Sequence, residues 1–141
     1  MTQYLDTSVL VSALTNEAAS HRVRAWFTSQ NSDDLVISDW VVTEFSAALS
    51  IKLRTGAIME VKRAEALAEF RRLVNRSFTV LPVERSQFGV AARLADQFML
   101  GLRAADALHL AIAHDHGATL CTLDRRLAEA AGPLGVMAEL I

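Results

Sequence analysis

This 141-residue sequence lacks a second cysteine for an intramolecular disulfide bond, and it lacks an apolar run long enough to span a membrane. Its one cysteine, Cys121, excludes an intramolecular disulfide and fits a reducing compartment. The apolar neighbours of Cys121 predict a small buried hydrophobe. No apolar run approaches the ~20 residues that span a bilayer, and no basic segment followed by an apolar one opens the chain. We therefore expect a cytoplasmic protein that does not engage a membrane.

Excess charge and low-complexity sequence are also scarce. The chain carries 14 basic and 16 acidic side chains, for a formal net charge of −2, so its overall charge does not indicate nucleic-acid binding. An anionic substrate would have to be attracted locally or through a metal ion. Repeats, linkers and low-complexity tracts are absent, and a hydrophobic fraction of 52% argues against disorder. Residues 1–141 are predicted to form a single domain with its own core.

What the chain does contain is an alternation of short β-like segments with longer helical ones. Strands are predicted at residues 3–5, 35–38, 79–82 and 118–122, with a weaker edge strand at 136–141. Helices are predicted at residues 7–14, 19–29, 39–54, 60–75, 84–99, 104–116 and 124–131. This alternation predicts the α/β class, as an α/β/α sandwich around a central, mainly parallel sheet of four to five strands.

Four carboxylates stand among apolar neighbours: Asp6, Glu44, Asp106 and Asp124. Asp6 ends the first predicted strand and Asp124 follows the fourth, and ligands of open parallel sheets bind beyond those strand ends. Glu44 lies on the apolar side of its helix with no basic residue at helical spacing. Asp106 lies near the N-terminal end of a helix that is apolar almost all round. Because buried carboxylates are costly unless neutralised, the four together predict a metal site.

Each acid taken singly also has a structural explanation. Asp6 and Asp124 could cap the helices that follow them, because Asp is a preferred N-cap residue. Asp106 could pair with Arg103 three residues earlier, and Glu44 could lie at a solvated edge of its helix. Convergence of all four on one end of the sheet favours the metal site over four separate explanations.

The ligand type suggests the chemistry. An all-oxygen site suits Mg²⁺ or Mn²⁺ better than Zn²⁺, and such a site can activate water for attack on phosphorus. Ser8 and Thr122 place hydroxyls where they could orient a carboxylate or serve as helix caps. Arg103 could fix Asp106 or contact phosphate. His109, three residues after Asp106, is expected to be a core or interface histidine.

The four acids also carry a family resemblance. Asp6 in YLDTSVL, Glu44 in VVTEFSAAL, Asp106 in LRAADALHLAIA and Asp124 in TLDRRL resemble the ordered acids of PIN-domain ribonucleases, and more narrowly of VapC toxins from VapBC toxin–antitoxin modules. The resemblance implies a PIN-like fold and a Mg²⁺- or Mn²⁺-dependent endoribonuclease in which these four acids are catalytic and bind metal. It also implies an RNA substrate (tRNA, rRNA or mRNA), a VapB-like antitoxin that inhibits the enzyme, and a homodimer.

One position departs from the family pattern, and two alternatives stay open. Many relatives carry a further acid two residues after the last Asp, where this chain has Arg126, which puts a second metal position in doubt. A catalytically silent PIN-like module that binds RNA or protein is the main alternative. A phosphatase or receiver-like domain built on Asp6 is disfavoured, because position 8 is Ser and no Lys follows Lys62.

Overall fold

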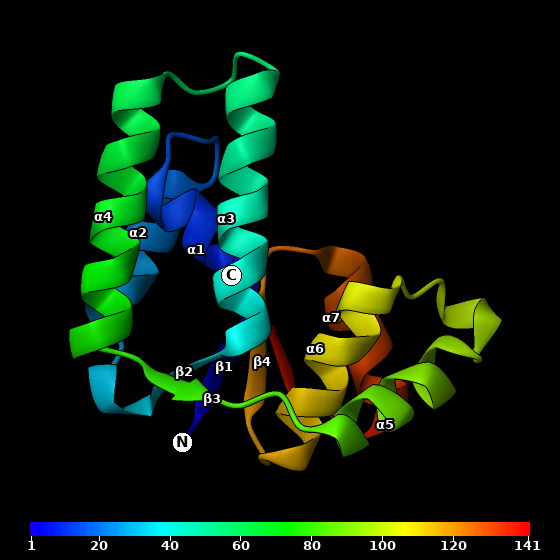
Figure 1. Ribbon diagram of the computed structural model, residues 1–141. Helices are drawn as coiled ribbons and strands as arrows, with labels where there is room; N and C mark the ends of the chain where they lie inside the picture. The colour runs from blue at the N-terminus through cyan, green and yellow to red at the C-terminus, as the bar shows by residue number, and fades with distance from the viewer.

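The computed structural model describes residues 1–141 and contains one five-stranded sheet (Figure 1). Its strands are β1 (Gln3–Leu5), β2 (Leu35–Ser38), β3 (Thr79–Leu81), β4 (Thr119–Thr122) and β5 (Ala138–Leu140). They lie in the order β3-β2-β1-β4-β5, and every neighbouring pair is parallel. The predicted α/β class is confirmed: the sheet is wholly parallel, and the weak C-terminal segment is its fifth strand.

Seven α-helices connect and flank the strands. They are α1 (Thr7–Leu14), α2 (Ser20–Ser29), α3 (Asp39–Arg54), α4 (Glu60–Arg76), α5 (Arg85–Ala95), α6 (Ala104–Asp115) and α7 (Arg125–Ala131). Three short 3₁₀ segments occupy Ser32–Asp34, Phe98–Leu100 and Gly132–Leu134. Figure 1 shows α3 and α4 as an upright hairpin on one side of the molecule, with α5, α6 and α7 gathered on the other. None of the helices combines the length and the apolar character needed to cross a membrane.

The strand order reverses beside β1, the central strand. The chain moves from β1 outward to β2 and β3, then returns to the other side of β1 with β4. In the register of this pair Leu5 lies beside Cys121, and the Asp6 amide donates to the Cys121 carbonyl over 3.1 Å. Such a reversal is where open parallel sheets bind ligands. The residues that follow β1 and β4 are therefore neighbours at the carboxyl end of the sheet.

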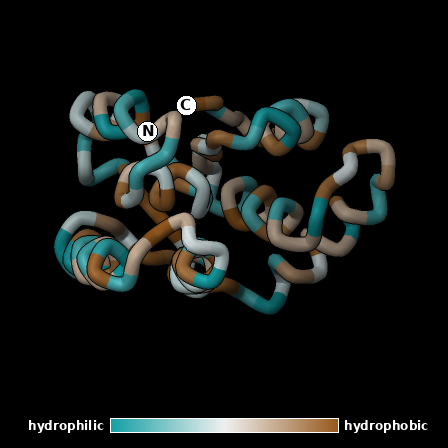
Figure 2. The backbone as a smooth tube through the Cα atoms, turned by 90° about the horizontal axis from the view of Figure 1, so that it is seen from above, coloured by the Kyte–Doolittle hydropathy of each residue, from teal (hydrophilic) through white to brown (hydrophobic).

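The core forms where each element buries its apolar side. Phe45 of α3 stacks on Phe70 of α4 with ring centroids 4.1 Å apart, which fixes the hairpin. Figure 2 looks down on this hairpin and shows polar and apolar residues alternating around the helices, as expected when one face is buried. Helix α6 is buried at every position from 107 to 113, so its packing fixes the position of its first turn, which contains Asp106. Burial raises the pKa of the Cys121 thiol to about 12, which fits the buried hydrophobe predicted there.

Most element boundaries agree with the prediction to within two residues, but α5 ends earlier than expected. The sequence predicted a helix over 84–99, whereas α5 stops at Ala95 and Asp96 caps it. Gln97 then leaves helical backbone angles, and residues 98–100 form a 3₁₀ turn closed by Gly101 with φ +64°. Phe98 and Met99 are consequently carried on an exposed turn before α6 and not on a helix face.

Candidate functional site

Asp6 is buried at the end of β1, with both carboxylate oxygens hydrogen-bonded. Its Oδ1 accepts from the Ser8 amide at 3.0 Å and from the Ser8 hydroxyl at 2.5 Å, and its Oδ2 accepts from the Thr122 hydroxyl at 2.5 Å. Burial raises the pKa of this carboxyl above its usual range, although these hydrogen bonds act in the opposite direction. No basic side chain forms an ion pair with Asp6. Its ionised form therefore has donors but no counter-cation.

Thr122 links Asp6 to Asp124. Its hydroxyl donates to Asp6 and accepts from the Asp124 amide at 2.9 Å. Asp124 caps α7, because its Oδ1 accepts from the amides of Arg126 at 2.9 Å and Leu127 at 3.3 Å. The other oxygen of Asp124 accepts no hydrogen bond from the protein, and the residue is exposed. Capping thus occupies one oxygen of this carboxylate and leaves one free, so the two interpretations of Asp124 are compatible.

Asp106 lies in the first turn of α6, half-exposed. Its Oδ2 accepts from the Arg103 main-chain amide at 3.2 Å. The side-chain ion pair between Arg103 and Asp106 that the sequence allowed is not formed. Asp106 and Asp124 line the same small cavity of about 30 Å³, and both Arg103 and Arg126 also line it. The cavity therefore joins carboxylates from α6 and from the end of β4.

Arg126 lies at this cavity but is paired with neither acid. Its guanidinium donates to the Gly101 carbonyl at 3.3 Å. A Cβ added at Gly101 would lie 2.8 Å from Arg126 Nη2, so the arginine packs closely on the turn that precedes α6. Arg126 thus remains exposed while one edge of its guanidinium is anchored, and its charge is not neutralised by Asp106 or Asp124.

Glu44 has partners that its own helix does not supply. Its Oε1 accepts from the Thr7 hydroxyl at 2.7 Å and contacts His109 Nε2 at 2.5 Å. Burial would raise the pKa of Glu44, but His109 and the Thr7 hydroxyl outweigh it and leave the pKa below its usual value. A solvated helix edge is therefore the wrong explanation for Glu44, whose side chain is only 23% exposed.

Two residues of this site were not predicted as part of it. Thr7 directly follows Asp6, and His109 lies one helical turn after Asp106 in a run of apolar side chains. That spacing was the available signal for His109, since residues three apart on a helix share a face. Sequence reasoning placed His109 in the core, which its 3% exposure confirms, but missed its contact with Glu44.

The four predicted acids therefore lie at one end of the sheet, connected through Thr122, Thr7, His109 and a shared cavity. Nevertheless, no three side chains of His, Cys, Asp or Glu are grouped closely enough to hold one ion. The site fits a hard cation by donor type and by charge: Asp6, Asp106 and Asp124 have no ion-pair partner, and Asp106, Asp124 and Glu44 each keep one oxygen without a protein donor. To hold a shared ion, the side chains of Asp106 and Asp124 would have to rotate, and both are solvent-accessible.

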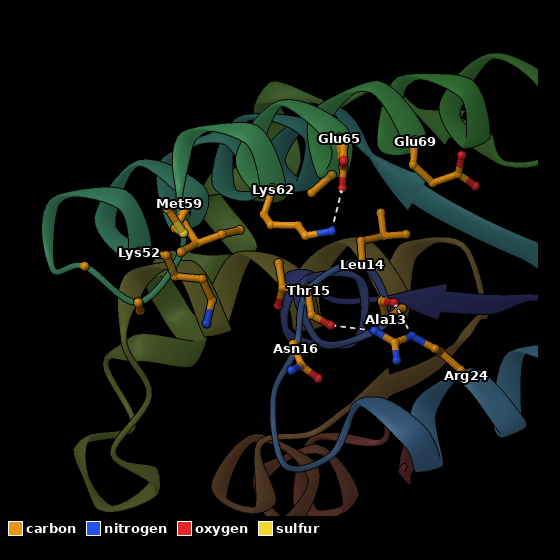
Figure 3. Close-up of a pocket in the computed structure, with 14 residues that line it drawn as sticks. Ala13, Leu14, Thr15, Asn16, Arg24, Lys52, Met59, Lys62, Glu65 and Glu69 are labelled. Carbon is orange, nitrogen blue, oxygen red and sulfur yellow. Dashed lines mark hydrogen bonds and ion pairs between the residues drawn. The ribbon is translucent and has the colours of Figure 1, made fainter.

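The largest groove in the molecule is elsewhere. It has a volume of about 640 Å³, lies between the α1–α2 segment and the α3–α4 hairpin, and contains none of the four acids (Figure 3). A smaller groove of about 290 Å³ shares Ala13, Leu14 and Arg24 with it and is mostly apolar. An open cleft of about 520 Å³, in contrast, reaches the acids, because Thr7, Ser8 and Asp124 line it together with Lys52.

Comparison with known proteins identifies a family and solved structures that share this architecture. The family model described as the PIN domain matches residues 3–133. No curated protein matches the chain. The FitAcB structure from Neisseria gonorrhoeae is 23% identical, with a TM-score of 0.71 over 97% of this chain and 96% of that one. VapC20 of Mycobacterium tuberculosis, described as a sarcin–ricin loop cleaving toxin, is 16% identical, with a TM-score of 0.76 over 92% and 95%.

A third solved structure extends this fold likeness to a toxin–antitoxin complex. VapBC2 from Rickettsia felis, bound to a DNA fragment from its promoter, is 15% identical, with a TM-score of 0.68 over 99% of this chain and 98% of that one. At such identities these likenesses establish a common fold. The family model covers nearly the whole chain, so the chain belongs to the PIN-domain family.

Proposed function

We propose that this chain is a metal-dependent endoribonuclease of the VapC toxin type, which hydrolyses RNA phosphodiester bonds. The observation that carries the proposal is the gathering of Asp6, Glu44, Asp106 and Asp124 at the carboxyl end of the sheet, three of them without a counter-cation. Solved structures with the same fold include a toxin described as cleaving the sarcin–ricin loop, which supports RNA as the substrate class.

The proposed roles follow from the hydrogen bonds. Asp6, Asp106 and Asp124, with Glu44, would hold Mg²⁺ or Mn²⁺, the ions that suit all-oxygen ligands. When bound, such an ion polarises the phosphate and activates water for attack on phosphorus. Ser8 and Thr122 orient the Asp6 carboxylate by donating to opposite oxygens.

Basic groups at the rim of the site would receive the RNA backbone. The exposed guanidinium groups of Arg103 and Arg126 line the same cavity as Asp106 and Asp124 and are free of ion pairs, so they can donate to phosphate oxygens. The open cleft lined by Thr7, Ser8 and Asp124 gives a single strand access to the acids from the side of α1 and α3. RNA binding would then depend on local charge, as the net charge of −2 requires.

The test is cleavage of structured RNA by the purified chain with Mg²⁺ or Mn²⁺, compared with Asp6→Asn and Asp106→Asn. Each substitution removes one carboxylate charge at nearly constant volume, and we expect a loss of about 100-fold or more. Asp33→Asn is the matched control, because Asp33 is an exposed acid in the 3₁₀ segment before β2, at the opposite end of the sheet.

Two results would contradict the proposal: cleavage that persists in EDTA, or Asn variants as active as the original chain. The spacing of the acids gives the catalytically silent RNA- or protein-binding module its support, because no three of them surround one point. RNA that binds without being cut, with either metal ion present, would favour that module.

The proposal includes an antitoxin of the VapB type and a homodimer. The largest groove offers an antitoxin segment the apolar side chains of Leu14, Ile58 and Met59, and Arg24 lines it next to Ala13. Met59 and Arg24 lie toward opposite ends of the groove in Figure 3. The Arg24 guanidinium donates to the carbonyls of Ala13 and Thr15 but pairs with no acid. A partner segment with apolar residues and a carboxylate would therefore match the groove. The mass of the purified chain by light scattering tests the homodimer.

A further inference from the structure

A continuous line of buried hydrogen bonds ends on Glu44. His109 contacts Glu44 Oε1 through Nε2 at 2.5 Å and the Tyr4 hydroxyl through Nδ1 at 2.8 Å. The Tyr4 hydroxyl lies 2.8 Å from Ser38 Oγ, which accepts from the Val41 amide at 3.4 Å. Tyr4 and Ser38 are fully buried and His109 is 3% exposed. Three polar side chains from β1, β2 and α6 are thus kept from water and lead to one carboxylate.

The direction of donation along this line follows from the chemistry at its ends. Ionised Glu44 offers only lone pairs, so His109 Nε2 must carry the hydrogen in this contact. In the neutral ring Nδ1 is then an acceptor, and the Tyr4 hydroxyl donates to it. A phenol is protonated at neutral pH, so the buried Tyr4 hydroxyl is able to donate. Ser38 donates to Tyr4 in turn, so every group in the line is satisfied.

The line also determines which oxygen of Glu44 is free. The Thr7 hydroxyl donates at 2.7 Å to Oε1, the oxygen that His109 contacts, and no protein group donates to Oε2. Two donors from different elements on one oxygen restrict rotation of the carboxylate. His109 belongs to the helix that supplies Asp106, so α6 brings one acid to the site and fixes the orientation of another.

We propose that His109, itself held by Tyr4 and Ser38, is a positioning residue that orients Glu44 so that Oε2 is presented for cation and substrate chemistry. The inference rests on the proposed function and extends it to residues behind the four acids. A buried histidine with a purely structural role would also need partners on both ring nitrogens, so the observation that carries the inference is that the acceptor on Nε2 is one of the four acids. Groups that orient a metal-binding side chain typically contribute about 10- to 100-fold to metal affinity or activity.

The test compares His109→Leu with His109→Gln. Leucine fills the buried space without donating, whereas the glutamine amide can donate to Glu44 from about the position of Nε2. We expect His109→Leu to lower kcat about 10- to 100-fold with KM little changed, and to weaken Mn²⁺ binding measured by calorimetry without RNA. His109→Gln should recover most of both losses. His114→Leu, the same change at the exposed end of α6, is the matched control and should alter neither.

Two further measurements keep the inference testable if His109→Leu does not fold. Tyr4→Phe removes only the hydroxyl that holds Nδ1, and it should lower kcat by a smaller factor without changing KM. Nitrogen NMR of the imidazole, which needs no activity, should find the ring proton on Nε2 in the original chain. A proton on Nδ1 alone would overturn the inference, as would equal kcat and Mn²⁺ affinity in the leucine and glutamine variants.

These readouts separate the inference from the proposed function. If the original chain cuts no RNA, the proposed function fails, while the imidazole NMR and the Mn²⁺ affinities still decide whether His109 positions Glu44. If the chain cuts RNA and His109→Leu cuts it equally well, the positioning role fails and the nuclease proposal stands.

Discussion

Single residues at this site do two things at once, and Thr122 is the clearest case. Its buried hydroxyl donates to Asp6 and accepts from the Asp124 amide, so it holds the ends of β1 and β4 together while orienting a carboxylate. Asp6 and Asp124 likewise cap α1 and α7, because the Oδ1 of each accepts main-chain amides in the first turn of the helix. Capping and cation binding are thus compatible at the level of individual oxygens, and neither observation excludes the other.

Replacing Thr122 by valine isolates the hydroxyl, because the two side chains have nearly the same shape. Asp6 Oδ2 would lose its donor in a buried position and the Asp124 amide would lose its acceptor. We expect a loss of about 1–3 kcal/mol in the free energy of unfolding, measured by urea denaturation. Thr119→Val is the control on the same strand, since the Thr119 hydroxyl contacts only the Met1 sulfur at an exposed position. Equal losses in both variants would show that Thr122 has no special part in the site.

At the scale of elements, helix ends decide where chemistry and recognition can occur. Because α5 stops at Ala95, the chain makes a turn closed by Gly101 before entering α6, and Arg126 is anchored on that turn. The α3–α4 hairpin rises beyond the sheet and forms one wall of the largest groove (Figure 1). The four acids and the candidate antitoxin groove thus lie on different parts of the fold.

The groove leads to a prediction about its wall. Met59 and Val61 are two residues apart at the start of α4 and similarly exposed, at 77% and 68%, but only Met59 lines the groove. Met59→Asp would remove apolar contact and repel an acidic partner, so we expect at least a tenfold weaker complex with the short protein encoded immediately upstream, if co-expression yields one. Val61→Asp should change the affinity less than twofold, as measured by calorimetry. Equal weakening by both changes would place the partner elsewhere.

Across the whole molecule, sequence predicted the sheet and the location of the four acids at one of its ends, but not how the acids are held. Strands and helices were predictable because periodicity and capping are local properties, and Asp6 and Asp124 mark their helix starts in the sequence. The contact of Glu44 with His109 joins residues 65 positions apart, and no local pattern encodes it. The end of α5 was missed because its apolar residues continue through Met99 although the backbone turns at Gln97.

The unbalanced charge of the whole site predicts how the fold responds to metal. Asp6, Asp106 and Asp124 lack counter-cations, so an ion that binds them stabilises the folded chain relative to the unfolded one. At tenfold excess over Kd, Mn²⁺ should add about 1.4 kcal/mol, or roughly 4 °C in Tm for a chain of this size. Asp6→Asn should lose this increase in calorimetry, whereas Asp33→Asn should keep it. An equal rise in both variants would mean that Mn²⁺ binds away from the four acids. That result would exclude the carboxyl end of the sheet as the metal site.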